Sequence, residues 1–230
     1  MIPRRLHYCW YGPEKTEQVK ACINSWRKFL PNYEIIEWNE SNTVLDSSFL
    51  KGAFEQKRWT HLSDYVRSRA LFEHGGIYLD VDVELIKPLD DLLENRCFLV
   101  FQMRRRSDEW VSVATMGSEP GHLFWQECMQ RWKKMYQDEN IFELGPYTAT
   151  LLLTRRGLCQ YGEQMLGDIK LYPHEYFYPY SRRETFIPQK HIKPQTHGIH
   201  YWSPMTKGLR PGRIKYHVRK WLLKLKGYGK

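Results

Sequence analysis

Apolar and polar positions along the chain follow two patterns, short apolar runs that are typical of β-strands and 3.6-residue periods that are typical of helices. Residues 6–11 and 33–38 form two such runs, and apolar residues recur at helical spacing between positions 14 and 29. A strand, a helix and a second strand at this spacing predict a βαβ unit whose strands run parallel.

The same patterns continue beyond this unit. Gly75 and Gly76 directly follow a helical period and are a typical helix stop. The further elements predicted are helices over 49–57, 63–74, 120–136, 146–155 and 212–226, strands over 77–80 and 97–101, a short helical turn over 89–93, and strands with ordered loops over 170–203. We therefore expect one α/β domain over residues 1–206 and an extension over residues 207–230.

Positive charge is concentrated at the end of the chain. Residues 207–230 contain nine Lys or Arg and no Asp or Glu, which accounts for the whole formal net charge of +9. The near-neutral remainder argues against nucleic acid as a partner, because nucleic-acid binders usually carry their charge on the folded domain. Apolar residues of the extension share one helical face, which predicts a basic amphipathic helix on an anionic membrane surface; a helix packed on the domain and a disordered tail remain alternatives.

Cysteine and hydropathy patterns bear on the cellular compartment. The five cysteines are scattered, odd in number and without Cys-x-x-Cys spacing, which predicts reduced thiols and neither disulfides nor a zinc site. No apolar run is long enough to span a bilayer, and residues 1–5 are not followed by the apolar core of a signal peptide. We therefore expect a cytoplasmic protein, with the basic extension as its contact to the cytoplasmic face of the membrane.

Two carboxylates, Asp80 and Asp82, stand at the end of the apolar run that follows the glycine pair. Residues two apart on a strand share a face, so the two acids can converge, and ligands of open α/β sheets bind at the carboxyl ends of the strands. One acid can bind Mn²⁺ or Mg²⁺ directly, while the other reaches a ribose or the metal through water. A cation held by few protein ligands usually also holds a phosphate, which favours an enzyme that handles a diphosphate. A solvated strand edge is the alternative.

Residues 63–67 (SDYVR) and 71–84 (LFEHGGIYLDVDVE) resemble the DxD sugar-binding region of glycosyltransferase family 32. Weaker likeness extends over residues 2–10, 35–39, 87–89, 172–177 and the segment around His200. The resemblance implies a Rossmann-like GT-A fold, a nucleotide-sugar donor that is most often UDP-linked, a Mn²⁺-type cation and retention of anomeric configuration. It also implies a glycan or lipid-linked acceptor, as in capsule or O-antigen synthesis.

The resemblance further implies roles for individual acids and their partners. Asp82 would be the direct metal ligand, and Asp80 would bind the ribose and assist the metal. Asp64 and Arg67, one helical turn apart on a face toward these acids, resemble the pair that grips donor-sugar hydroxyls. Without the downstream motif, a surface salt bridge would be the favoured interpretation of that pair.

The remaining site residues are aromatic or lie near the end of the domain. Trp10 resembles the aromatic residue beside the donor base, and Tyr78 faces the same way as Asp80 by strand parity and would line the donor pocket; a core role is equally open for both. His200 is the candidate third ligand of the metal or diphosphate, with Ser203 a weaker one, although the family's second histidine is replaced by a tyrosine. His197 is expected to be exposed.

Two other classes of function share some of these features. Paired acids also occur in metal-dependent phosphohydrolases and nucleotidyltransferases, which would need further carboxylates around two metals. A non-enzymatic binder of membrane or nucleic acid would act through the basic extension and would tolerate loss of the acids. The glycosyltransferase hypothesis predicts the reverse.

Overall fold

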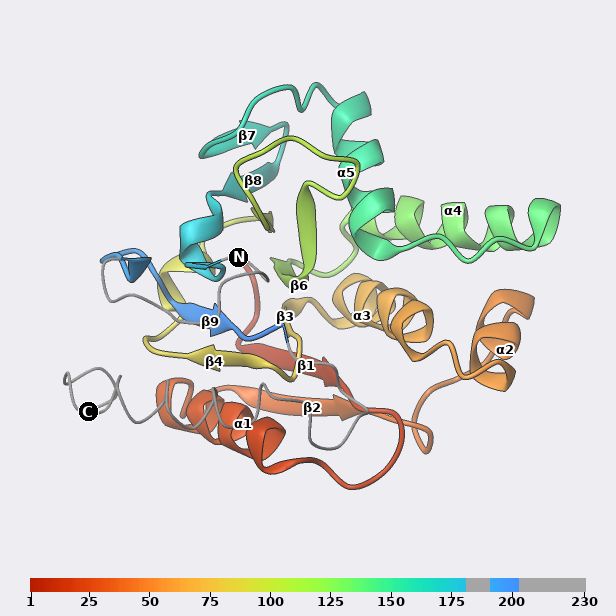
Figure 1. The fold of residues 1–230 in the computed structure, drawn as a ribbon, viewed down its shortest axis with the longest axis horizontal. Helices are drawn as coiled ribbons and strands as arrows, with labels where there is room; N and C mark the ends of the chain where they lie inside the picture. Colours follow the sequence, from red (N-terminus) through yellow and green to blue (C-terminus); the bar gives the residue numbers. More distant parts are fainter. Residues whose placement is uncertain (181–190, 203–230) are drawn as a thin grey trace. The chain divides into compact units, whose positions relative to one another are not determined.

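The computed structural model describes residues 1–180 and 191–202, which divide into two compact units. The first unit contains residues 1–14, 32–81 and 90–173, and the second contains residues 15–31, 82–89 and the described residues from 174 to 202. Figure 1 shows the elements of both. The predicted boundary between residues 206 and 207 and the predicted helix over 212–226 lie outside the described residues.

The first unit is built on a seven-stranded mixed sheet in the order β2-β1-β3-β6-β5-β8-β7, counted over the described residues. Its strands are β1 (Arg5–Cys9), β2 (Glu34–Trp38), β3 (Gly76–Leu79), β5 (Cys97–Phe101), β6 (Val111–Ser118), β7 (Gln164–Leu166) and β8 (Ile169–Tyr172). β1 pairs in parallel with both β2 and β3, which confirms the parallel pairing predicted for the first two strands.

Strand directions place the loops after β3 and β5 at the same edge of the sheet. β6 is antiparallel to both strands, so β3 and β5 run in the same direction and their carboxyl ends meet at one edge. Between Leu99 and Val100 the partner register on β6 jumps from Met116 to Ser112, a bulge that leaves residues 113–115 out of the ladder with β5.

Two helices, α3 (Trp59–His74) and α5 (Gly145–Arg155), pack against this sheet, and α2 (Ser48–Glu55) and α4 (Leu123–Glu139) pack on them (Figure 1). A short 3-10 turn, η1 (Asp90–Leu92), lies at the predicted place. Alternate residues of β5, namely Cys97, Leu99 and Phe101, belong to the core that packs beneath these helices. Burial of this apolar face drives the assembly of the unit.

The end of α3 is set by the glycine pair. Gly75 has φ +64° and Gly76 has φ +111°, a region that side chains with a Cβ rarely enter. A Cβ on Gly76 would lie 2.7 Å from the carbonyl oxygen of Arg5. The glycines therefore end the helix and let β3 start in close contact with β1.

The second unit contains α1 (Glu17–Phe29), β4 (Val83–Leu85), the 3-10 turn η2 (His174–Tyr176) and β9 (Gly198–His200). β4 and β9 form an antiparallel pair in which Val83 faces His200. α1 is fastened to β4, because the Trp26 indole donates to the Val83 carbonyl (2.7 Å) and the Leu85 N–H donates to the Ser25 hydroxyl (2.9 Å).

The structure contains three strands that the sequence-based prediction lacked, β4, β6 and β7, and one helix, α3, that starts earlier than predicted. All eight residues of β6 are buried, so the strand lacks the polar alternation that would reveal it. α3 begins at Trp59, four residues before the predicted start, and Arg58 before it makes no side-chain cap.

No described helix is both long and apolar enough to cross a membrane. All five cysteines are free thiols, as predicted.

Candidate active site

α3 brings Asp64 and Arg67 into the interior of the first unit. The two residues are almost fully buried, with 1% and 4% of their surface exposed. The Arg67 Nη2 lies 3.5 Å from the Asp64 Oδ1, so the predicted i,i+3 pair exists but is not a surface salt bridge. Burying this much charge is costly unless every group is matched, which makes the surrounding contacts decisive.

Arg67 connects α3 to the end of β3. Its Nη1 lies 3.2 Å from the Asp80 Oδ1, and the Tyr78 hydroxyl donates to the same oxygen at 3.0 Å. The guanidinium carbon of Arg67 stands 4.4 Å from the centroid of the Tyr78 ring. Tyr78 thus faces the same way as Asp80, as strand parity predicted, and it holds both the cation and the acid.

The bulge in β6 supplies backbone partners to this cluster. The Val113 carbonyl accepts from the Arg67 Nη1 at 2.7 Å, and the Ala114 carbonyl accepts from the Asp80 N–H at 2.8 Å. The Ser112 hydroxyl accepts in turn from the Ala114 N–H at 3.0 Å. Because residues 113–115 leave the ladder with β5, the Val113 carbonyl is available to the guanidinium.

The first turn of α5 completes the surroundings of Asp64. The Gly145 N–H donates to the Asp64 Oδ2 at 2.7 Å, so an acid from α3 satisfies a donor at the start of α5. A Cβ on Gly145 would lie 2.7 Å from the Asp64 Cγ and 2.8 Å from the Val113 Cγ2. Only a glycine lets the helix approach this closely.

Burial and charge shift the pKa values of the cluster in different directions. Burial raises the pKa of Asp64 to about 6, although Arg67 and the Gly145 N–H partly oppose the shift. Burial alone would lower the pKa of Arg67, but Asp80, Tyr78 and Asp64 raise it overall, so the guanidinium stays charged. Burial raises the pKa of Tyr78 well above its usual value and keeps its hydroxyl a donor.

In the second unit, Asp82 pairs with His200. The His200 Nε2 lies 3.1 Å from the Asp82 Oδ1, and the two side chains are only 8% and 9% exposed. β9 places the histidine, because the His200 N–H donates to the Phe177 carbonyl (2.9 Å) and the next N–H, of Tyr201, donates to the Asp82 carbonyl (3.0 Å). Two of the predicted metal ligands, 118 positions apart in the sequence, are therefore neighbours.

The position of His197 contradicts the sequence-based expectation of an exposed side chain. It is fully buried, its Nδ1 donates to the Pro88 carbonyl at 2.7 Å, and its ring stacks on Phe177 at 5.8 Å between centroids. Its N–H also donates to the Tyr176 carbonyl. A polar sequence context predicts an exposed histidine, but the His197 side chain is buried and holds the segment before β9 in place.

Trp10 and Ser203 are the remaining predicted site residues. Trp10 is 6% exposed directly after β1, and its indole N–H donates to the Pro13 carbonyl at 2.7 Å. A donor contact of Trp10 stays a prediction. Ser203 lies outside the described residues.

Sequence reasoning missed the contributions of Gly145 and of the β6 carbonyls. Gly145 is followed by Pro146, which indicates the helix start but not that the Gly145 N–H meets Asp64. The Val113 and Ala114 carbonyls left no signal, because a backbone acceptor has the same chemistry at every position.

Two family models match the chain. The model described as a glycosyltransferase sugar-binding region containing a DXD motif matches residues 16–99, and the model described as an alpha 1,4-glycosyltransferase conserved region matches residues 117–217. The chain belongs to the DXD glycosyltransferases. The first match contains Asp80 and Asp82 of the DXD motif, and the second contains His200. The family resemblance noted from the motif is therefore confirmed.

This DXD glycosyltransferase is similar to part of each of two curated relatives. The human alpha-1,4-N-acetylglucosaminyltransferase is 30% identical over 67% of this chain and 46% of its own. The inositol phosphoceramide mannosyltransferase 3 of Schizosaccharomyces pombe is 29% identical over 54% of this chain and 35% of its own. The chain thus spans less than half the length of these two relatives.

A solved structure shows the same fold. The PaToxG glycosyltransferase superposes with a TM-score of 0.54 at 16% identity, covering 68% of this chain and 70% of that one. The fold is the GT-A type, a mixed α/β arrangement around a central sheet, as the resemblance implied.

Proposed function

We propose that this DXD glycosyltransferase moves a hexose from a nucleotide sugar, foremost a UDP-sugar, to a hydroxyl of a glycan or lipid-linked oligosaccharide in polysaccharide synthesis, with retention of configuration. The observation that carries the proposal is the buried network that ends on Asp80. Arg67 is held there by Asp64, Asp80, the Val113 carbonyl and the Tyr78 ring. Burying this much charge costs stability even when it is paired, so its presence at the end of the DXD strand supports a role in the site.

A divalent cation fits the chemistry of the residues that would hold it. Asp80, Asp82 and His200 each offer one oxygen or nitrogen that can ligate a metal, and Asp82 and His200 are already paired in a buried position. Carboxylate oxygens with one imidazole nitrogen suit Mn²⁺, with Mg²⁺ the alternative. When bound, such a cation neutralises charge that develops on a diphosphate leaving group.

The protein's own residues would act by positioning. Arg67 keeps its charge and is held by contacts from four directions, so its remaining N–H capacity points in a fixed direction. Asp64 is fixed by the Gly145 N–H and can orient a sugar hydroxyl through Arg67 or directly. Groups held this rigidly lose little entropy when the donor binds, which lowers the barrier to transfer.

The chemistry we propose is attack of the acceptor hydroxyl on the face of the sugar from which the diphosphate leaves. The new glycosidic bond forms as the bond to the phosphate oxygen breaks, and the leaving phosphate takes the acceptor proton. This step needs no nucleophile from the protein. The two nearby carboxylates, Asp64 and Asp80, already bind Arg67, which agrees with a step that does not use them as nucleophiles.

The test is a panel of nucleotide sugars offered to the purified protein with Mn²⁺, with Mg²⁺ and with EDTA. The names of the relatives include N-acetylglucosamine and mannose, so the panel contains UDP-hexoses, their N-acetyl forms and GDP-mannose. We expect one donor to be bound and slowly hydrolysed with metal only. Asp82→Asn and His200→Gln should each lower turnover at least about 100-fold, since each removes a metal ligand.

The matched control is Asp138→Asn, which removes a carboxylate from an exposed ion pair on α4. It should leave turnover unchanged. Wild-type turnover in Asp82→Asn would contradict the metal role. Cleavage of the diphosphate in the absence of sugar transfer to any hydroxyl, water included, would favour a phosphohydrolase.

A further inference from the structure

The loop between α4 and α5, residues 140–144, carries a largely buried acid, Glu143, whose side chain is only 9% exposed. Arg131 of α4 donates to both of its carboxylate oxygens, from Nε to Oε2 at 2.5 Å and from Nη2 to Oε1 at 2.6 Å. A two-point pair of arginine and carboxylate is strong and restricts the direction of both groups. The Glu143 carboxylate therefore has a fixed orientation relative to α4.

The same carboxylate also binds the beginning of α5. The Thr148 hydroxyl donates to the Glu143 Oε2, and the Trp132 indole N–H donates to the Thr148 hydroxyl at 2.8 Å. Thr148 and Trp132 are buried, which reduces the competition of water for these bonds. One chain of hydrogen bonds thus joins α4, the loop and α5.

The start of α5 has no cap from its own sequence. Leu144 precedes the helix and makes no side-chain cap, and Pro146 has no N–H to donate. The Gly145 N–H finds its acceptor on another helix, since it donates to the Asp64 Oδ2 at 2.7 Å. Glu143 stands two residues before Gly145, so the bonds of Glu143 determine where this N–H points.

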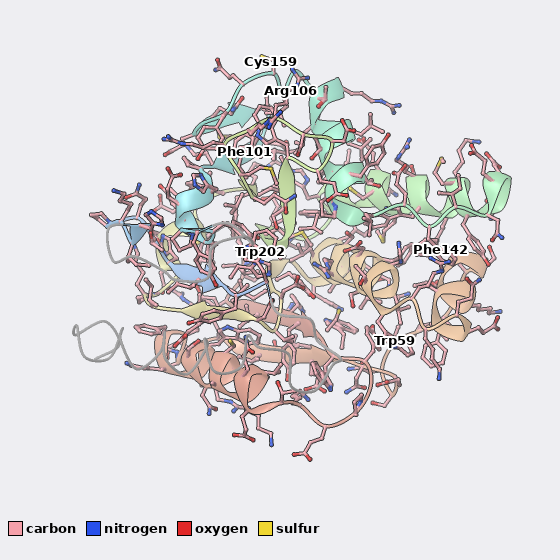
Figure 2. The ribbon with its side chains drawn as sticks, viewed as in Figure 1. Trp59, Phe101, Arg106, Phe142, Cys159 and Trp202 are labelled. Carbon is pink, nitrogen blue, oxygen red and sulfur yellow. The ribbon has the colours of Figure 1, made fainter. Side chains whose placement is uncertain are left out.

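Aromatic contacts also hold the loop. The Phe142 ring centroid lies 4.7 Å from that of Tyr136, 5.4 Å from that of Phe49 and 5.5 Å from that of His61. Figure 2 shows Phe142 near α2, the helix that contains Phe49. Apolar packing is not directional, whereas hydrogen bonds are. Packing of Phe142 therefore keeps the loop in place, and Glu143 sets its orientation.

Asp64 depends on the Gly145 N–H for its own orientation. One carboxylate oxygen accepts from Gly145, and the other lies 3.5 Å from the Arg67 Nη2. The last torsion of an aspartate side chain has a broad profile, so contacts and not torsional preference fix the carboxylate. A displaced Gly145 N–H would let the carboxylate of Asp64 turn away from Arg67.

We propose that Glu143 is a positioning residue for sugar transfer, which orients the start of α5 so that the Gly145 N–H stays on Asp64 and Asp64 stays on Arg67. This inference rests on the proposed function, because it adds a residue to the machinery of that reaction. Glu143 acts through Gly145, and its effect on the donor sugar passes through Asp64 and Arg67.

The experiment follows the Gly145 amide signal by nuclear magnetic resonance in full-length protein labelled at the glycine nitrogens. The signal is identified by its absence from Gly145→Ala, and it reports the bond to Asp64 because an N–H that donates to a carboxylate is deshielded. In Glu143→Gln, which removes the charge but keeps the size, we expect this signal to move more than that of any other glycine. The kcat for nucleotide-sugar turnover should fall at least about fivefold, with the KM of the donor changed less than about twofold.

The matched control is Glu127→Gln. Glu127 of α4 pairs with Arg156 at 2.5 Å, directly after the last residue of α5, so it joins the same two helices at the end away from Gly145. The control should leave the Gly145 signal and kcat as in wild type. Thr148→Val, which removes one bond of the Glu143 carboxylate and keeps the shape of the side chain, should shift the signal in the same direction and carries the test should Glu143→Gln not fold.

An unchanged Gly145 signal in Glu143→Gln and in Thr148→Val would overturn the inference. An equal shift in Glu127→Gln would overturn it too, because any loosening between α4 and α5 would then suffice. A moved signal with the kcat of wild type would also reject it, since the orientation of Asp64 would not matter for transfer.

The two proposals fail separately. Turnover of a nucleotide sugar that is as fast in Glu143→Gln as in wild type would sustain the proposed function and reject this inference. A Gly145 signal that moves in Glu143→Gln and not in Glu127→Gln, in a protein that turns over no nucleotide sugar, would reject the proposed function and keep Glu143 as the residue that orients Asp64.

Discussion

Position 145 has room for no side chain beyond a hydrogen. The Gly145 N–H donates to Asp64, and a Cβ there would contact both Asp64 and Val113 well inside van der Waals distance. Asp64 in turn binds Arg67, which binds Asp80. One glycine on α5 therefore controls the orientation of the acid next to the DXD motif.

Gly145→Ala is predicted to move Asp64 away from Arg67. Crowding of this kind costs about 1–3 kcal/mol of unfolding free energy. Nucleotide-sugar turnover should fall at least about tenfold, since positioned groups are sensitive to displacements near 1 Å. Urea unfolding and steady-state kinetics measure the two effects. Tyr147→Ala, at a partly exposed position of the same helix, is the control, and wild-type behaviour of Gly145→Ala would show that the contact is not required.

Among the helices and strands, two glycines with positive φ lie at different junctions, Gly76 at the start of β3 and Gly121 in the turn before α4. Gly76 and Gly121 both have positive φ, +111° and +75°, so alanine is strained at either position. Only at Gly76 would the added Cβ also meet backbone, the Arg5 carbonyl at 2.7 Å, whereas nothing lies within 4 Å at Gly121.

Gly121→Ala is predicted to cost about 1 kcal/mol, the penalty for a left-handed backbone alone. Gly76→Ala should cost at least about 2 kcal/mol more, because β3 must move away from β1. Thermal and urea unfolding compare the two variants. Equal losses would mean that the close approach of β1 to Gly76 contributes nothing to stability.

His7 joins three elements in its neutral form. Its Nε2 lies 2.8 Å from the Gly75 carbonyl and therefore donates, while its Nδ1 accepts from the Trp38 indole at 3.2 Å. Both bonds need the neutral ring with its proton on Nε2. Burial lowers the pKa of His7 from 6.5 to about 4, although the Gly75 bond opposes the shift.

The contribution of His7 to stability is predicted to fall as the pH falls from about 6.5 to about 4. In this window the unfolded chain binds a proton that the folded protein does not, so unfolding becomes easier. At pH 4.5 the loss relative to pH 8 is on the order of 2 kcal/mol. Urea unfolding of wild type and His7→Gln at both pH values measures it, and identical pH dependence in the two proteins would contradict the assignment.

At the scale of the whole molecule, charge is divided between a nearly neutral body and a basic end. The extension 207–230 carries the net charge of +9 and lies outside the described residues. We propose that it holds the enzyme at the cytoplasmic face of a membrane, where a lipid-linked acceptor would be presented. The observation that supports this is the alternation of cations with apolar residues and the absence of acids over these positions.

Removal of residues 207–230 is predicted to weaken binding to vesicles that contain phosphatidylglycerol by about tenfold or more, because several cations near an anionic surface contribute about 1 kcal/mol each. Binding to phosphatidylcholine vesicles should be weak for both proteins. Co-sedimentation at two salt concentrations measures the effect, since screening reduces it. Unchanged binding of the shortened protein would contradict the proposal, and hydrolysis of the donor serves as the check on folding.

Much of the fold could be predicted because its elements have local causes. The glycine pair ends α3, the apolar run makes β3, and parity alone brought Tyr78 and Asp80 to one face. β6 could not be predicted, since a strand buried on both faces has no alternation. The burial of His197 could not be predicted either, because its partners, Pro88 and Phe177, are distant in sequence or depend on the turn before β9.

The order of amino acids sets the chemistry that is available: the spacing of Asp80 and Asp82, the helical turn between Asp64 and Arg67, and the family to which the chain belongs. Local rules suffice for these features because covalent geometry fixes which neighbours share a face. The tertiary structure decided which groups meet, namely Asp82 with His200, Asp64 with the Gly145 N–H, and Arg67 with a carbonyl freed by a bulge. Such contacts depend on packing between distant segments, and burial makes them strong by removing the water that would compete for the same groups.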